Sequence, residues 1–73
     1  MQVLKENYKK NIAIMQENLK RGLNIKKAFS IIDNLENQFI NAGFYGNDEK
    51  DFINEMRKVV IEKNTNIKIN IIK

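Results

Sequence analysis

Apolar residues recur at steps of three and four over most of the chain, which is the spacing that places side chains on one face of an α-helix. In the first segment this apolar stripe runs through Leu4, Tyr8, Ile12, Met15 and Leu19. Lysines occupy much of the opposite face, and Gly22 follows directly after two cations, as is typical of a helix C-terminus. The pattern predicts a helix over about residues 3–21.

The second segment has the longest stripe in the chain. Asn24 directly precedes it and is suited to be its N-cap. Gly43 follows it and readily adopts the left-handed conformation common after a helix C-terminus, and the next residue in the chain is apolar. The pattern predicts a helix over about residues 25–42. Its apolar positions are Ile25, Ala28, Phe29, Ile32, Leu35, Phe39 and Ala42, with Ile31 and Ile40 widening the face.

A third stripe follows the turn at Gly46. Asn47 or Asp48 is suited to cap a helix, and acidic residues in its first turn favour the positive end of the helix dipole. The pattern predicts a helix over about residues 48–63. Its inner face consists of Phe52, Ile53, Met56, Val59 and Val60.

The last segment alternates apolar and polar residues, which is the period of a β-strand. The pattern predicts a short strand over about residues 66–72. Because no other segment alternates well, we expect this strand to pair between chains, with its own copy or with the sheet edge of another protein. Pairing with residues 2–4, continuation of the third helix and a frayed end are the alternatives. The candidate partner-binding residues are Ile67, Ile69 and Ile71.

These elements predict one small, mostly α domain over residues 1–73. We expect a three-helix bundle, or a helical hairpin plus a third helix, with the C-terminal strand paired to another molecule. The expected core consists of Leu4, Ile12, Met15, Leu19, Phe29, Ile32, Leu35, Phe39, Phe52, Met56 and Val60.

The composition argues against catalysis. The chain has no Cys and no His, which excludes disulfides, the common nucleophile–base pairs and the usual zinc ligands. A helical chain of 73 residues also has little room for a closed ligand pocket. We therefore expect no enzyme activity, no metal and no cofactor, and we expect a domain this small to be stabilised by a partner or by a second copy.

Charge is distributed unevenly along the chain, which carries a net +4. Four cations cluster around the turn between the first two predicted helices, and the spacing of this turn has a faint likeness to a helix-turn-helix. This turn is a candidate for phosphate contacts with nucleic acid, and a solvated surface is the alternative. Its cations are Lys20, Arg21, Lys26 and Lys27.

Two aromatic residues, Phe44 and Tyr45, lie between Gly43 and Gly46. Exposed aromatic residues in a turn are typical of protein-binding hot spots. The alternative is that Phe44 closes the end of the second helix against the core while Tyr45 lies at the rim. Both residues are therefore candidates for a protein-binding rim.

The remaining indications concern setting and function. No apolar run reaches the length of a membrane span and the N-terminus has no secretory h-region, so we expect a cytoplasmic protein with no membrane contact. Lys, Asn and Ile account for 35 of 73 residues, as in an AT-rich bacterium or one of its phages, plasmids or other mobile elements. The sequence predicts a regulator or inhibitor that binds another protein, with a homodimer expected. The alternative is a DNA-binding transcriptional regulator that uses the basic turn.

Overall fold

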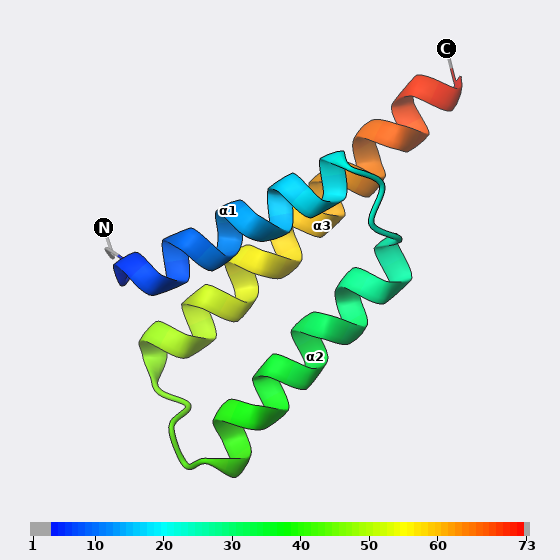
Figure 1. The fold of residues 1–73 in the computed structure, drawn as a ribbon. Coiled ribbons are helices and arrows are strands. Elements are labelled where there is room, and N and C mark those ends of the chain that lie inside the picture. The colour runs from blue at the N-terminus through cyan, green and yellow to red at the C-terminus, as the bar shows by residue number, and fades with distance from the viewer. Residues whose placement is uncertain (1–3, 73) are drawn as a thin grey trace.

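The computed structural model describes residues 4–72, and within them the side chains of residues 4–64. The chain forms three α-helices: α1 (Glu6–Lys20), α2 (Ile25–Asn41) and α3 (Asn47–Ile72) (Figure 1). The predicted helical class and the order of the three helices are confirmed. No helix in the described part of the chain combines the length and the apolar character that crossing a membrane requires.

Glycine ends both of the first two helices, as the sequence predicted. Gly22 and Gly43 have φ angles of 105° and 70°, a left-handed conformation that residues with a Cβ rarely adopt. After Gly43, the Phe44 amide donates to the Phe39 carbonyl at 2.9 Å, and after Gly22 the Leu23 amide donates to the Asn18 carbonyl at 2.9 Å. Each pattern is a Schellman motif, which satisfies the last carbonyls of a helix and turns the chain back.

The starts of the second and third helices are also capped by side chains. The Asn24 carboxamide oxygen accepts the Lys27 amide at 3.2 Å, which confirms the predicted N-cap of α2. Helix α3 differs from the expected Asn47 or Asp48 cap, because its first helical residue is Asn47 and the side chain that caps it is Glu49. The Glu49 carboxylate reaches back to the Gly46 amide, which is the reciprocal half of a capping box.

Helix α3 lies at the centre of the core. It packs against both α1 and α2, and its Phe52, Ile53 and Val60 are fully buried. One aromatic ring from each helix joins at the end of the bundle: Tyr8 stacks on Phe52 with 4.4 Å between ring centroids, and Phe39 meets both edge-on. Edge-on and offset-stacked aromatic pairs are favourable geometries, so this contact fixes the three helices at one end.

The expected core residues all lie in the core or pack against it. Met15, Leu19, Ile32, Phe52, Met56 and Val60 are buried, and the other five are partly buried against them. Tyr8, Ala28 and Ile53 are buried as well, although the expected core did not include them.

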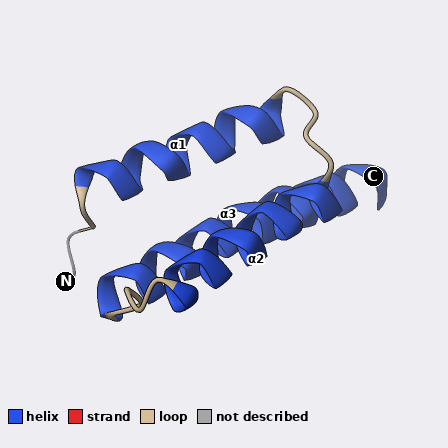
Figure 2. Ribbon diagram, turned by 60° about the horizontal axis from the view of Figure 1, so that its bottom comes forward, coloured by secondary structure: helices blue, strands red, loops and turns tan. Residues whose placement is uncertain are grey.

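Helices α1 and α2 each pack on α3 but contact each other little. In Figure 1 and Figure 2 the ribbons of α1 and α2 lie apart from each other, although each of them packs on α3. A short helix of ordinary amphipathic width buries one face, and here that face is used on α3. The neighbouring faces of α1 and α2 are therefore left open toward each other and toward solvent.

The predicted C-terminal strand is not shown, because the backbone of residues 66–72 continues helix α3. Residues 64–66 contain neither Gly nor Pro, so no residue stops the preceding helix. A helix also satisfies its own backbone hydrogen-bonding groups, whereas a single strand needs a partner for them. The side chains of Ile67, Ile69 and Ile71 lie outside the part of the chain whose side chains are described, and their binding role stays a prediction.

Two isoleucines on α3 test the position of the core. Ile53 is fully buried, whereas Ile61 is 53% exposed on the same helix. We expect Ile53→Ala to lower the free energy of unfolding by about 2–5 kcal/mol, enough to unfold much of a domain this small. The matched control, Ile61→Ala, should change it by no more than about 0.5 kcal/mol. Urea denaturation followed by far-ultraviolet circular dichroism measures both, and equal losses would contradict this core.

Candidate protein-binding groove

A groove of about 310 Å³ runs between α1 and α2, and we call it the α1–α2 groove. It forms because the two helices are carried side by side on α3 with little direct contact between them. Its lining comes from all three helices: Asn11, Ile14, Met15 and Asn18 of α1, Ile31, Leu35 and Gln38 of α2, and Met56 of α3.

The floor of the groove is buried and its two walls are apolar and exposed. Met15 and Met56 are each 4% exposed, whereas Ile14 is 57% exposed and Ile31 is 42% exposed. Each exposed isoleucine directly neighbours a buried residue of its stripe, which is Met15 for Ile14 and Ile32 for Ile31. One large aliphatic side chain from each helix thus stands in solvent at the same groove.

Among the side chains that the structure describes, no charged one lines the groove. Its polar members are the carboxamides of Asn11, Asn18 and Gln38, which donate and accept hydrogen bonds without carrying charge. The Asn11 carboxamide donates to the Asn7 carbonyl one turn earlier at 2.8 Å. The groove is therefore an apolar trough with a neutral, hydrogen-bonding rim.

Helix α1 is fixed to α3 by a buried carboxylate. Glu49 is 4% exposed, and its two oxygens accept from the Tyr8 hydroxyl at 2.6 Å and from the Gly46 amide at 2.9 Å. The Lys5 ammonium lies 3.5 Å from the same carboxylate. Burying a carboxylate is costly unless it is paired and hydrogen-bonded, and here it is both. We call Lys5, Tyr8, Gly46 and Glu49 the Glu49 network.

These contacts shift the proton affinities of both side chains. The hydrogen bond from Tyr8 lowers the pKa of Glu49 against the opposing effect of burial, and the backbone donors and Lys5 lower it further. Burial, together with the hydrogen bond to the carboxylate, raises the pKa of Tyr8 to about 12. The phenol thus keeps its proton and remains a donor throughout the physiological range.

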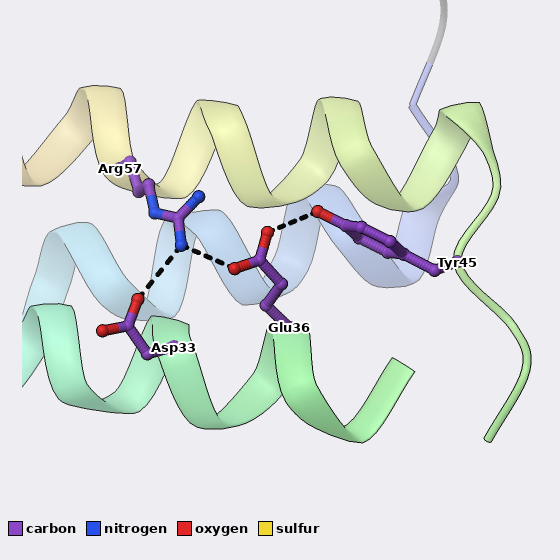
Figure 3. A network of polar contacts seen from close by, with 4 residues as sticks. All are labelled: Asp33, Glu36, Tyr45 and Arg57. Atoms are coloured by element: carbon purple, nitrogen blue, oxygen red, sulfur yellow. Dashed lines mark hydrogen bonds and ion pairs between the residues drawn. The ribbon is translucent and has the colours of Figure 1, made fainter. Parts of the chain in front are cut away.

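Helix α2 is fixed to α3 by a second polar group, drawn in Figure 3. One nitrogen of the Arg57 guanidinium donates to Asp33 at 3.0 Å and to Glu36 at 2.8 Å. The Tyr45 hydroxyl donates to the other oxygen of Glu36 at 2.5 Å. The hydrogen bonds from Arg57 and then Tyr45 lower the pKa of Glu36. We call Asp33, Glu36, Tyr45 and Arg57 the Arg57 network.

The predicted basic residues are all exposed around the turn that joins α1 to α2. The Arg21 guanidinium pairs with Glu17 at 3.4 Å, and the exposure of both side chains makes this pair weak. Lys26 and Lys27 lie in the first turn of α2, which holds no acidic residue. This turn connects the two helices that line the groove (Figure 1). Of its cations, Arg21 lies three residues after Asn18 and Lys27 lies four residues before Ile31, both of which line the groove.

The two predicted rim aromatics differ from each other. Tyr45 is half-buried and belongs to the Arg57 network, so it has a structural contact. Phe44 is 55% exposed. The centroid of its ring lies 6.5 Å from the centroid of the Phe39 ring and 5.3 Å from the Lys5 ammonium. Of the two aromatic residues, only Phe44 exposes most of its side chain to solvent.

Sequence reasoning did not identify the groove, Glu49 or Arg57 as important. A signal for the groove was present, because Ile14 and Ile31 each widen an apolar stripe on one side. A signal for Glu49 was also present, since a glutamate three residues after Gly46 fits a capping box. No local pattern could indicate Arg57, whose partners lie 24 and 21 residues earlier in the chain.

Comparisons of the chain with models of protein families, with curated proteins and with solved structures find no match. Among the described residues, no group of three or more Asp, Glu, His or Cys side chains is placed to hold a metal ion. The α1–α2 groove and the two polar networks are the features from which we infer a function below.

The depressed pKa values of Glu36 and Glu49 predict a loss of stability in acid. Both carboxyls bind protons more weakly in the folded chain than in the unfolded one. The free energy of unfolding should therefore be steady above their ordinary value of 4.5 and fall as the pH drops through the lower folded-state values. Chemical denaturation at a series of pH values measures this fall.

Replacing one of the two carboxyls measures how much of the loss of stability in acid is due to that carboxyl. Glu49→Gln should lower stability at neutral pH and make the decline in acid shallower, because the buried titrating group is gone. The control is Glu55→Gln, which alters an exposed carboxylate of the same helix and should change neutral-pH stability by at most about 0.5 kcal/mol. A Glu49→Gln protein with unchanged stability and an unchanged acid profile would contradict the Glu49 network.

Proposed function

We propose that this protein is a non-enzymatic regulator or inhibitor that acts by binding a helix of another protein in its α1–α2 groove. The observation that carries the proposal is the exposure of Ile14 and Ile31 on the two walls of one apolar groove. Single exposed apolar residues are ordinary on a protein surface, whereas apolar residues gathered in a groove mark a binding site.

The dimensions of the groove fit a helix. Its lining extends from Asn11 to Asn18 on α1 and from Ile31 to Gln38 on α2. Each stretch is about two helical turns, or roughly 10 Å, in length. A helix that lies in such a groove presents apolar side chains at positions i, i+3 or i+4, and i+7.

The two polar networks support this use. Glu49 fixes α1 and Arg57 fixes α2, each by contacts with side chains from across the helix interface. The walls of the groove are thus held by α3 rather than by each other. A preformed groove loses less conformational entropy on binding, which favours affinity.

The chemistry of the lining also supports binding over catalysis. Asparagine, glutamine, isoleucine, leucine and methionine contribute no group that titrates or acts as a strong nucleophile. The neutral rim can satisfy the backbone or polar side chains of a bound helix. Selectivity then depends on shape and on charges outside the groove.

Three of the sequence predictions remain proposals beside this one. A homodimer is a second use of an apolar surface, and the alternating isoleucines of residues 67–71 are a second candidate surface for a protein partner. Nucleic-acid binding is the alternative function. Two lysines lie in the first turn of α2, where the helix dipole is unfavourable for cations. A contact with phosphate groups would account for their position, so they favour this alternative.

Selection from a displayed library of helical peptides of about 15 residues tests the proposed function and defines the sequence that the groove prefers. We expect enrichment of peptides with apolar residues at helical spacing. Their binding should be lost in the double variant Ile14→Asn with Ile31→Asn, which keeps the fold because both residues are exposed.

The matched control is Ile61→Asn, which alters an isoleucine of similar exposure on α3 outside the groove and should bind the selected peptides normally. Deletion of residues 65–73 examines the tail in the same assay. Peptides that bind the groove double variant as well as the original protein would contradict the proposal, and loss of binding only in the deletion would transfer the site to the tail.

A further inference from the structure

The charges next to the α1–α2 groove have one predominant sign. Residues three or four apart on a helix are surface neighbours. Lys10 lies four residues before Ile14, Lys27 lies four before Ile31, and Arg21 lies three after Asn18. All three cations are exposed. Glu17, the one acidic residue at the same spacing from the lining, is paired with Arg21 at 3.4 Å.

We propose that the occupant of the groove is an acidic amphipathic helix, with a short apolar stripe and acidic side chains beyond each end of it. This inference rests on the proposed function, and it adds the chemistry of the partner. The uncharged lining takes the apolar stripe, and the flanking cations take the acidic ends. Complementary charge at a rim steers association and selects partners.

The spacing of the cations indicates where the acids lie. Lys10 and Arg21 are eleven positions apart in the sequence. On a helix that separation is about 16 Å, or three turns. Lys27 lies on α2 near the same end as Arg21, because both flank the connection between the helices (Figure 1). A matching helix therefore carries acids about three turns apart, one that meets Lys10 and one that meets Lys27 beside Arg21, whose charge Glu17 partly offsets.

A second copy of the chain fits this groove poorly. If two grooves met about a two-fold axis, the cations at either end would face cations, whether the helices ran parallel or antiparallel. Residues 63–73 are also a poor occupant, because they contain three lysines and no acid. A different protein with acidic helix ends avoids both repulsions.

Three designed peptides test the charge requirement directly. They share one helical sequence of about 15 residues with Leu at positions i, i+3 and i+7, and they differ only in carrying Glu, Gln or Lys at positions i−1 and i+10, which flank that stripe about three turns apart. Fluorescence anisotropy of the labelled peptides measures the affinity. We expect the Glu peptide to bind about tenfold more tightly than the Lys peptide at low salt, with the Gln peptide between them. High salt should narrow the difference.

Neighbouring lysines in the first turn of α2 give a matched pair of variants. Lys27→Glu should weaken the Glu peptide and strengthen the Lys peptide. Lys26→Glu should leave both nearly unchanged, because neither the residues three nor those four positions away from Lys26 line the groove. If the basic turn binds nucleic acid instead, the two lysines should be equivalent. The inference would be overturned in favour of nucleic-acid binding if the protein bound a DNA duplex in a salt-sensitive way and both variants weakened that binding equally.

The outcomes separate this inference from the function on which it rests. Equal binding of the three peptides, abolished by Ile14→Asn with Ile31→Asn, would overturn the acidic partner and keep the groove. Binding of the Glu peptide that survives the groove double variant would overturn both. Binding that requires the two isoleucines and reverses its charge preference in Lys27→Glu supports the acidic helix.

Discussion

Helix α3 supplies the surface against which α1 and α2 bury their apolar faces. The α1–α2 groove follows from this arrangement. Phe52, Ile53 and Val60 are fully buried on α3, while α1 and α2 each use one apolar face against it. Because the two short helices contact each other little, their adjacent faces stay uncovered. The α1–α2 groove is thus a result of how the core is built, with apolar walls that the core itself does not need.

The Glu49 network and the Arg57 network fix the positions of α1 and α2 on α3. Apolar packing alone permits neighbouring helices to slide and rotate with little loss of free energy. A buried carboxylate that loses its donors is far more costly, so Glu49 restricts α1 to positions that keep the Tyr8 hydrogen bond. Arg57 restricts α2 in the same way through Glu36. Both networks have a member on α3, so the walls of the groove are set by one helix.

Much of this fold follows from the sequence. The three stripes, the glycines at the ends of α1 and α2, and the Asn24 cap are local signals. They predicted the starts of all three helices and the ends of α1 and α2 to within a few residues, whereas α3 continues well beyond its predicted end at residue 63. The strand prediction for residues 66–72 rested on alternation and on the β-branched isoleucines, and the strand is not shown, because the backbone of these residues continues α3. The groove and the Arg57 network depend on how helices distant in sequence are arranged, so no local pattern contained them. Lys27 and Lys26 illustrate this, since their different neighbours become evident only once the groove is known.

Backbone amide chemical shifts during titration with a Glu-flanked helical peptide test the central claim most directly, because they report every helix at once. If α3 holds α1 and α2 apart around a binding groove, the largest changes will map to residues 11–18 and 31–38, with a smaller set at Arg21 and Lys27. The exposed side of α3 around Ile61 will remain unchanged. Changes confined to the basic turn, or centred on residues 65–72, would contradict the claim.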